Sequence, residues 1–228
     1  MLRTCRRYTE RRARLVGTAA AATALAVAGG TALTGTAAAA TPGPTVLKSA
    51  LLSPSDTGMT GAQSAAGGGV GGDGVSGCAA LVKVLRAAPG PGTQEADFTG
   101  GQSGPLLSEQ LTTGSAGRVA GVYAQEKAAL TSCRDLTLTS DGTKLALRLT
   151  PTHLVTASGA QTTATRMDGQ LSGVPVNGYL AFGRVGQVLV GYMFFQISDT
   201  SPQLASSLYQ KAVTKVRHTV ATGGGTPV

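Results

Sequence analysis

The chain has 228 residues, and its 19 basic and 11 acidic residues give a formal net charge of +8. Six arginines and one acidic residue fall within residues 1–40, so residues 41–228 hold 13 basic and 10 acidic side chains and are close to neutral. The net charge of this part is small and its charged residues are scattered. This excludes a nucleic-acid-binding domain, which needs clustered basic residues. It also excludes a basic amphipathic helix that would bind a membrane surface.

Residues 1–40 have the three parts of a secretory signal peptide. A basic head ends at Arg14, an uncharged run rich in Ala, Gly and Thr covers Leu15 to Leu33, and Ala38-Ala39-Ala40 supplies small residues for cleavage. A retained membrane anchor is the alternative, but a run with so few Leu and Val residues would insert weakly. We therefore expect cleavage after Ala40, an extracytoplasmic, secreted protein and no stable membrane anchor. The Arg11-Arg12 pair leaves twin-arginine export open beside the general route.

Residues 41–228 are numerous enough for one domain with a hydrophobic core. The first expected helix is short and carries Leu47 and Leu51. Ser53-Pro54-Ser55-Asp56 then predicts a new helical turn, because it places a serine cap, a proline at the first position and an acidic residue at the third.

A glycine-rich stretch at residues 61–77 contains the spacing G-x-G-x-x-G at Gly72, Gly74 and Gly77. A dinucleotide site needs a buried strand directly before such glycines, and the preceding residues offer only Met59 as a large apolar side chain. Glycine- and serine-rich runs without a hydrophobic period are typical of flexible linkers. We therefore predict a linker inside the domain and no nucleotide cofactor.

The next expected helix, Cys78 to Ala88, begins with a cysteine, and only one other cysteine, Cys133, remains after cleavage. Two cysteines in an exported protein predict a disulfide, because disulfides persist in oxidising compartments. A reactive thiol or a metal ligand is the alternative, but neither cysteine has a second Cys or a His at ligand spacing. We expect the disulfide and no metal site.

The middle of the chain predicts two short strands and a helix. One strand surrounds Ala96 and Phe98. The other runs from Leu107 to Thr113, where Leu107, Glu109, Leu111 and Thr113 alternate with polar residues. A helix capped by Ser115 ends at Cys133. Its apolar stripe has three- and four-residue spacing and consists of Val119, Val122, Tyr123, Glu126 and Leu130.

The following residues are mostly strands. Asp135 to Leu149 consists of two runs of alternating apolar and polar residues on either side of Asp141-Gly142, and such a pair predicts a tight hairpin turn. Two further strands are expected at His153 to Ser158 and Thr162 to Leu171, and Asn177 to Ser198 gives two more with a turn near Arg184. The second of these is apolar at nearly every position, which predicts a central strand covered on both faces.

A closing helix is predicted from Pro202 to Val220, with Ser201 as its cap. Consecutive hairpins imply antiparallel pairing, because parallel neighbours need a crossover connection. The expected fold class is therefore α+β, with helices packed on one antiparallel sheet of about five to seven strands.

The order of these elements and cysteines resembles the PknH-like extracellular sensor domain family over about Leu47 to Val220. The residues that carry the resemblance are the start LLSPSD, a cysteine opening the next helix, and SAGRVAGVYAQEKAALTSC followed by a β-meander and a helix. The resemblance implies an α+β fold with a cleft, no catalysis, and a role in sensing or binding at the cell envelope. Family members carry two bridges, whereas this chain can form one.

Residues suited to catalysis are few. GQSGP around Ser103 lacks the second glycine of a nucleophile elbow. His153 at a predicted strand start and His218 in the last turn of the closing helix suit structural positions, although spacing alone leaves a triad through His153 open. Neither histidine is predicted to be catalytic.

Acidic and aromatic groupings give little more. Glu95 with Asp97, and Asp135 with Asp141, have the form of paired carboxylates for glycosidic or metal chemistry but lie in no sugar-binding context. Met193-Phe194-Phe195 can line a ligand pocket, although consecutive strand positions indicate core first. We identify no catalytic, cofactor-binding or metal-binding residue from the sequence.

Three hypotheses for function remain. The first is an exported, non-enzymatic binding or sensor-like domain acting at the envelope, with an unidentified ligand. The second is a secreted hydrolase with an unrecognised active site. The third is an interaction protein that docks to another exported protein.

Overall fold

The computed structural model describes residues 41–65, 74–87, 90, 92–101, 104–140, 142–197 and 201–223. These residues belong to one unit, Ala39–Val228. The predicted signal peptide, residues 1–40, lies outside the described residues. No helix among the described residues has the length and apolar character needed to span a membrane.

The unit is built on one antiparallel sheet, in which nine strands are described, in the order β1-β3-β4-β9-β8-β7-β6-β5-β2. The α+β class and the antiparallel pairing are as predicted, while the strand number is higher than expected. The strands are β1 (Thr60–Ala65), β2 (Gly74–Gly77), β3 (Thr93–Thr99), β4 (Leu106–Thr113), β5 (Asp135–Ser140), β6 (Thr143–Thr152), β7 (Gln161–Leu171), β8 (Val174–Val185) and β9 (Val188–Ile197).

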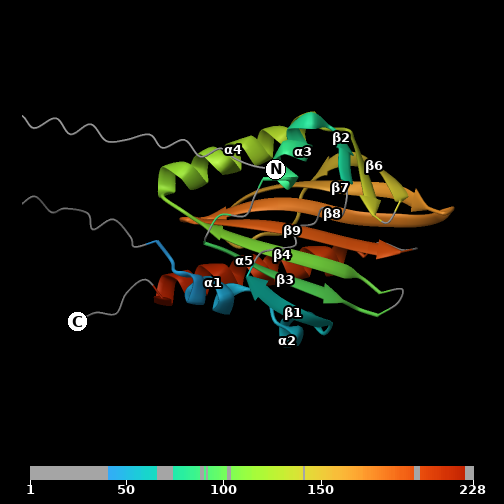
Figure 1. Ribbon diagram of the computed structural model, residues 1–228. Coiled ribbons are helices and arrows are strands. Elements are labelled where there is room, and N and C mark those ends of the chain that lie inside the picture. Colours follow the sequence, from blue (N-terminus) through green and yellow to red (C-terminus); the bar gives the residue numbers. More distant parts are fainter. Residues whose placement is uncertain are drawn as a thin grey trace, which may run out of the picture. The chain divides into compact units, whose positions relative to one another are not determined.

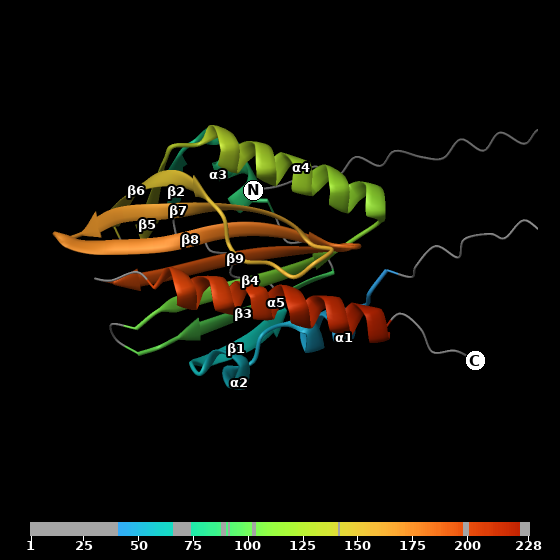
Figure 2. The ribbon, with the colours of Figure 1, turned by 180° about the vertical axis from the view of Figure 1, so that it is seen from behind.

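Helices cover both faces of this sheet (Figures 1 and 2). On one face lie α1 (Pro44–Ala50) and the long α5 (Pro202–Gly223), with the short α2 (Pro54–Thr57) beside them. On the other face lie α3 (Ala79–Leu85) and α4 (Ala116–Ser132). The sheet therefore has two buried faces and two cores.

Strand β9 shows why both faces need cover. It pairs with β4 on one side and β8 on the other. Val190 and Phe194 join the core beneath α1 and α5, whereas Met193 joins the core beneath α3 and α4. The prediction of a central strand covered on both faces is confirmed, because successive side chains of a strand point to opposite faces.

Tight turns connect the long strands. Gly142, Gly173 and Gly186 all have positive φ, at 75°, 81° and 58°, and stand at the β5–β6, β7–β8 and β8–β9 turns. Ser172 precedes Gly173 with φ 51°, which gives that hairpin two successive left-handed residues. This is the geometry that short hairpins with the right-handed strand twist require.

The sequence prediction was wrong at residues 153–158. They form no strand, because β6 ends at Thr152 and an irregular segment leads to β7. Leu154 packs into the core beneath α5, and the backbone N–H of Val155 donates to Oγ of Ser206 on that helix at 2.8 Å. The buried Leu154 and this backbone hydrogen bond hold the segment against α5 in place of strand pairing.

Both ends of the predicted linker, residues 61–77, belong to strands. Gly61 lies in β1, where a Cβ would collide with the carbonyl of Asp97 on β3. Gly77 in β2 has φ +102°, and a Cβ there would lie 2.9 Å from the carbonyl oxygen of Asp135. The glycines therefore permit close edge pairing that the linker interpretation did not anticipate. Residues 66–73, including Gly72, lie outside the described residues.

Candidate functional site

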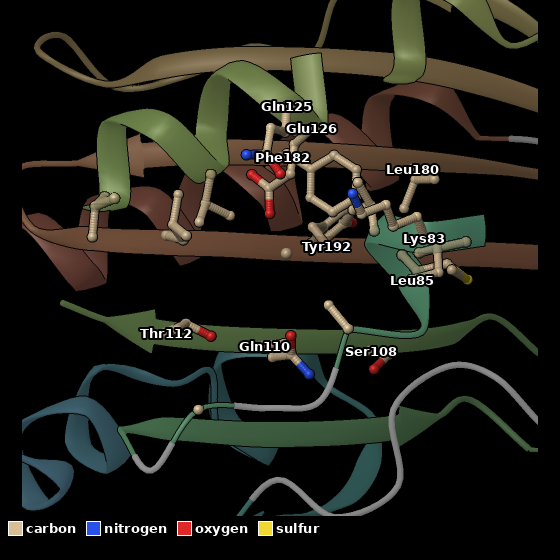
Figure 3. Close-up of a pocket in the computed structure, with 18 of the residues that line it drawn as sticks. Lys83, Leu85, Ser108, Gln110, Thr112, Gln125, Glu126, Leu180, Phe182 and Tyr192 are labelled. Carbon is tan, nitrogen blue, oxygen red and sulfur yellow. The ribbon is translucent and has the colours of Figure 1, made fainter. Parts of the chain in front are cut away.

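A pocket of about 260 Å³ lies between helices α3 and α4 and the strands β4, β8 and β9. Its lining is largely apolar with a few polar groups, as in small-molecule binding sites. Figure 3 shows the helix side chains across the cavity from those of β4. The principal lining residues are Lys83 and Leu85 of α3, Gln125 and Glu126 of α4, Ser108, Gln110 and Thr112 of β4, and Leu180 and Phe182 of β8.

A disulfide holds the helical wall of the pocket at one end. Cys78 is the N-cap residue of α3 and Cys133 is the C-cap residue of α4, with their Cα atoms 5.6 Å apart. The predicted bridge is present. Leu81 and Leu130 pack beside it on the sheet. Because the bridge joins the start of one helix to the end of the other, it restricts how far the two can separate.

The opposite end of α4 is fixed by a cap and by packing. The N–H of Arg118 donates to Oγ of Ser115, the predicted N-cap residue, at 3.4 Å. Val119 and Tyr123 pack against Leu189 of β9. The helix is therefore fixed at both ends, and the pocket lies beneath its N-terminal half, from Arg118 to Glu126.

A glycine leaves room on the sheet side of the pocket. Gly191 of β9 pairs with Gln110 of β4 and Phe182 of β8 and lines the cavity. A Cβ at this position would meet only Gln110, at distances of 3.6 Å and more, which is ordinary van der Waals contact. A larger side chain at this position would project into the pocket without a clash at its base.

Two buried polar atoms in the pocket have no hydrogen-bond partner among the described residues. They are Oε2 of Glu126 and Oγ of Ser108, which belong to opposite walls. Glu126 is only 9% exposed, and burial raises its pKa from 4.5 to about 8. Buried polar groups in proteins are normally hydrogen-bonded. These two atoms therefore mark where a ligand could place a polar group.

A second buried carboxyl, Glu109, lies on the other face of the sheet and outside this pocket. It is fully buried, and its Oε2 accepts a hydrogen bond of 2.7 Å from the backbone N–H of Leu52, while Oε1 has no partner among the described residues. Burial raises its pKa to about 8, and the Leu52 donor opposes that rise. The contact fastens the segment after α1 to the sheet, which is a structural role.

The histidines lie apart from the pocket between α3, α4 and the sheet. His153 is exposed in the segment after β6, beside a shallow groove that it forms with α5 residues such as Ser206. His218 is exposed on the last turns of α5. Neither lines the pocket that contains Glu126. Ser103 lies outside the described residues.

The structure describes three of the four residues in the acidic pairs considered from the sequence. On β3, Glu95 is buried and Asp97 is exposed. Asp135 is exposed at the start of β5, and Asp141 lies outside the described residues. Within the described part of the chain, no group of three His, Cys, Asp or Glu residues is placed to hold a metal ion.

The Met193-Phe194-Phe195 triplet divides between the two faces. Phe194 is fully buried in the core beneath α1 and α5, as the core interpretation predicted. Met193 is buried in the core beneath α3 and α4, again as predicted, and it also lines the pocket.

Glu126 was not recognised as a site residue from the sequence. It was assigned to the apolar stripe of its helix, and an acidic residue at a stripe position was the available signal. Ser108 gave no signal, because it stands at a polar position of an alternating strand. Gly191 interrupts the apolar run of β9, and an isolated glycine in a strand was the available signal.

Comparison with solved structures finds the same fold in the crystal structure of the extracellular domain of PknH from Mycobacterium tuberculosis. The TM-score is 0.54 at 11% sequence identity, over 74% of this chain and 93% of that chain. A second match, the X-ray structure of an Rv0999 ortholog from Mycobacterium smegmatis, has a TM-score of 0.36 at 14% identity, over 64% and 77% of the chains. No protein-family model and no curated protein matches the sequence. The relationship with the PknH domain, expected from the sequence, is thus confirmed for the fold alone.

Proposed function

We propose that this chain is an exported, non-enzymatic, sensor-like binding domain of the cell envelope, and that it binds a small ligand in the pocket between α3, α4 and the sheet. The observation that carries this proposal is the pairing of an apolar cavity with two buried polar atoms, on Glu126 and Ser108, that lack partners among the described residues. Unpaired polar atoms cost folding free energy. Their retention is expected where a ligand supplies the missing hydrogen bonds.

Export is supported by three observations. Disulfides such as Cys78–Cys133 persist in oxidising compartments. The first forty residues have the composition of a signal peptide. The PknH domain that shares the fold is described as extracellular. A hydrolase finds no comparable support, because neither His153 nor His218 lines the pocket that contains Glu126 and Ser108.

The binding proposal can be tested with an uncharged fluorescent probe, N-phenylnaphthylamine, whose emission rises in apolar pockets. We expect enhancement with the exported wild-type protein. The Gly191→Leu variant should abolish it, since the new side chain would fill the cavity. Gly121→Leu is the matched control, because Gly121 lies on the exposed side of α4 with nothing within 4 Å of an added Cβ. Equal enhancement in both variants would refute the assignment of the pocket.

A further inference from the structure

The polar groups of the pocket point to the charge state of its ligand. We propose that the pocket selects an uncharged ligand: a small apolar molecule whose amide- or hydroxyl-type group both donates and accepts hydrogen bonds between Glu126 and Ser108. This inference rests on the proposed function and adds the chemical class of the ligand. It depends on three features: the two buried atoms without partners, the neutral groups around them, and the cations at the pocket wall.

The first feature is the position of the two atoms. Glu126 projects from α4, and Ser108 belongs to β4 on the opposite wall (Figure 3). Register places Ser108 opposite Met193 of β9, which lines the same cavity. A ligand inside the cavity therefore meets a polar atom without a partner on either wall, whereas the adjoining side chains of Phe182 and Val122 are apolar.

The second feature is the chemistry of the polar lining. Gln110, Thr112 and Gln125 are all neutral, and each side chain can both donate and accept. Burial raises the pKa of Glu126 to about 8, so at neutral pH its carboxyl is mostly the acid, with one O–H donor and a carbonyl acceptor. An amide or an alcohol matches such a set of groups, because it too presents a donor and an acceptor.

The third feature is charge. Lys83 of α3 and Arg118 of α4 line the pocket and are exposed. A cationic ligand would approach two like charges before it reached Glu126. An anionic ligand would be drawn to these exposed cations but would have to leave water for a largely apolar cavity, where the neutral Glu126 carboxyl offers no opposite charge. An uncharged ligand avoids both costs.

The ionisable groups around Glu126 come from several elements. On α4 itself they are Arg118 and Tyr123, whose pKa is raised mainly by burial and further by the charge of Glu126. The lining residues of β4 and β8 include no ionisable side chain. Lys83 of α3 and Tyr192 of β9 line the pocket, and Tyr209 of α5 interacts electrostatically with Glu126. Register places Glu95 of β3 opposite the lining residue Gln110.

The test uses four probes with one ring system: naphthalene, and naphthalene bearing a carboxamide, an aminomethyl group or a carboxylate. The affinity of each probe is measured by its displacement of N-phenylnaphthylamine from the wild-type protein at about pH 6 and about pH 9. We expect the carboxamide to bind most tightly near pH 6 and about tenfold more weakly near pH 9, because Glu126 is then mostly ionised. The aminomethyl and carboxylate probes should bind more weakly than naphthalene near pH 6.

Variants separate the contributions. Glu126→Gln keeps a donor and an acceptor, so carboxamide binding should persist and lose its pH dependence. Ser108→Ala should weaken carboxamide binding roughly fivefold, about one hydrogen bond, and leave naphthalene unchanged. Glu109→Gln is the matched control, because it removes a carboxyl buried on the opposite face of the sheet. It should alter neither affinity nor its pH dependence.

The outcomes distinguish this inference from the proposed function. If no probe displaces N-phenylnaphthylamine, or none binds in a way that Gly191→Leu blocks, the pocket itself is wrong. If naphthalene binds but the aminomethyl probe is preferred, tightens at higher pH and fails with Glu126→Gln, the site selects cations and this inference alone is overturned. Equal binding of all four probes, or carboxamide binding indifferent to both Glu126→Gln and Ser108→Ala, overturns it as well.

Discussion

Replacing Glu109 by glutamine should make the protein more stable at alkaline pH and leave its stability nearly unchanged at acidic pH. Glutamine keeps the side-chain length and an acceptor for the N–H of Leu52, but it cannot ionise. Glu109 is fully buried, and burial raises its pKa from 4.5 to about 8. The folded wild-type protein therefore keeps a proton that the unfolded chain releases above about pH 4.5.

The sign and size follow from this linkage. The protonated carboxyl imposes no charge penalty below pH 4.5, and the penalty develops as pH rises towards the folded pKa of about 8. One pKa unit corresponds to about 1.4 kcal/mol, so the full rise corresponds to roughly 5 kcal/mol. We expect the wild-type protein to lose roughly 2–5 kcal/mol more than the variant between about pH 5 and about pH 8.5.

Urea unfolding of the exported protein at both pH values, followed by circular dichroism, measures this difference. Asp97→Asn is the matched control, because Asp97 is an exposed carboxyl on the neighbouring strand β3. It should lose as much stability as the wild type over the same range. If the Glu109→Gln variant lost as much stability as the wild type, burial would not raise the pKa of Glu109, and the prediction would be refuted.

Three further predictions concern stability. Reduction of the Cys78–Cys133 bridge should raise the intact mass by about two hydrogens, and an unchanged mass would contradict the presence of the bridge. Because the bridged residues are 55 apart in the sequence, its removal should lower the free energy of unfolding by roughly 3–4 kcal/mol. Leu81→Ala, which empties a fully buried site beneath α3, should cost roughly 2–5 kcal/mol in the same urea assay. Tyr192→Phe removes the buried hydrogen bond to the carbonyl of Ala205 and should cost roughly 1–2 kcal/mol; a loss within 0.3 kcal/mol would show that bond to be unimportant.

Most of the fold could be predicted because its strands and helices have strong periodic patterns. The run around β9 is apolar at consecutive positions, and this alone implied a strand with two covered faces. The Asp141-Gly142 pair predicted the β5–β6 hairpin, and Gly142 has the positive φ that such a turn needs. The covered strand and the hairpin turn both depend on residues that are neighbours in the sequence, so they could be predicted without knowledge of the tertiary structure.

The edge strands could not be predicted, since their stability comes from partners far away in the sequence. Residues 60–65 and 74–77 contain almost no large apolar side chain, yet they pair with β3 and β5. A strand of this kind is defined by backbone hydrogen bonds and close approach, which glycine permits. Composition therefore suggested a linker at places where the sheet was extended at both edges.

The candidate site was hidden for a related reason. Glu109 and Glu126 both stand at apolar positions of their patterns, one on a strand and one on a helix. The pattern predicted burial correctly for both residues. It carried no information on hydrogen-bond partners, which depend on the elements that pack opposite them.

The partners are what separate a structural acid from a binding one in this fold. Both carboxyls are buried, and burial raises the pKa of each to about 8. Glu109 faces a donor supplied by the chain, the N–H of Leu52, and lines neither the pocket beneath α4 nor the groove beside His153. Glu126 faces a cavity and has no such donor among the described residues. The glutamine variants should therefore differ in kind: the change at residue 109 should be visible in stability against pH, and the change at residue 126 in ligand affinity against pH as well.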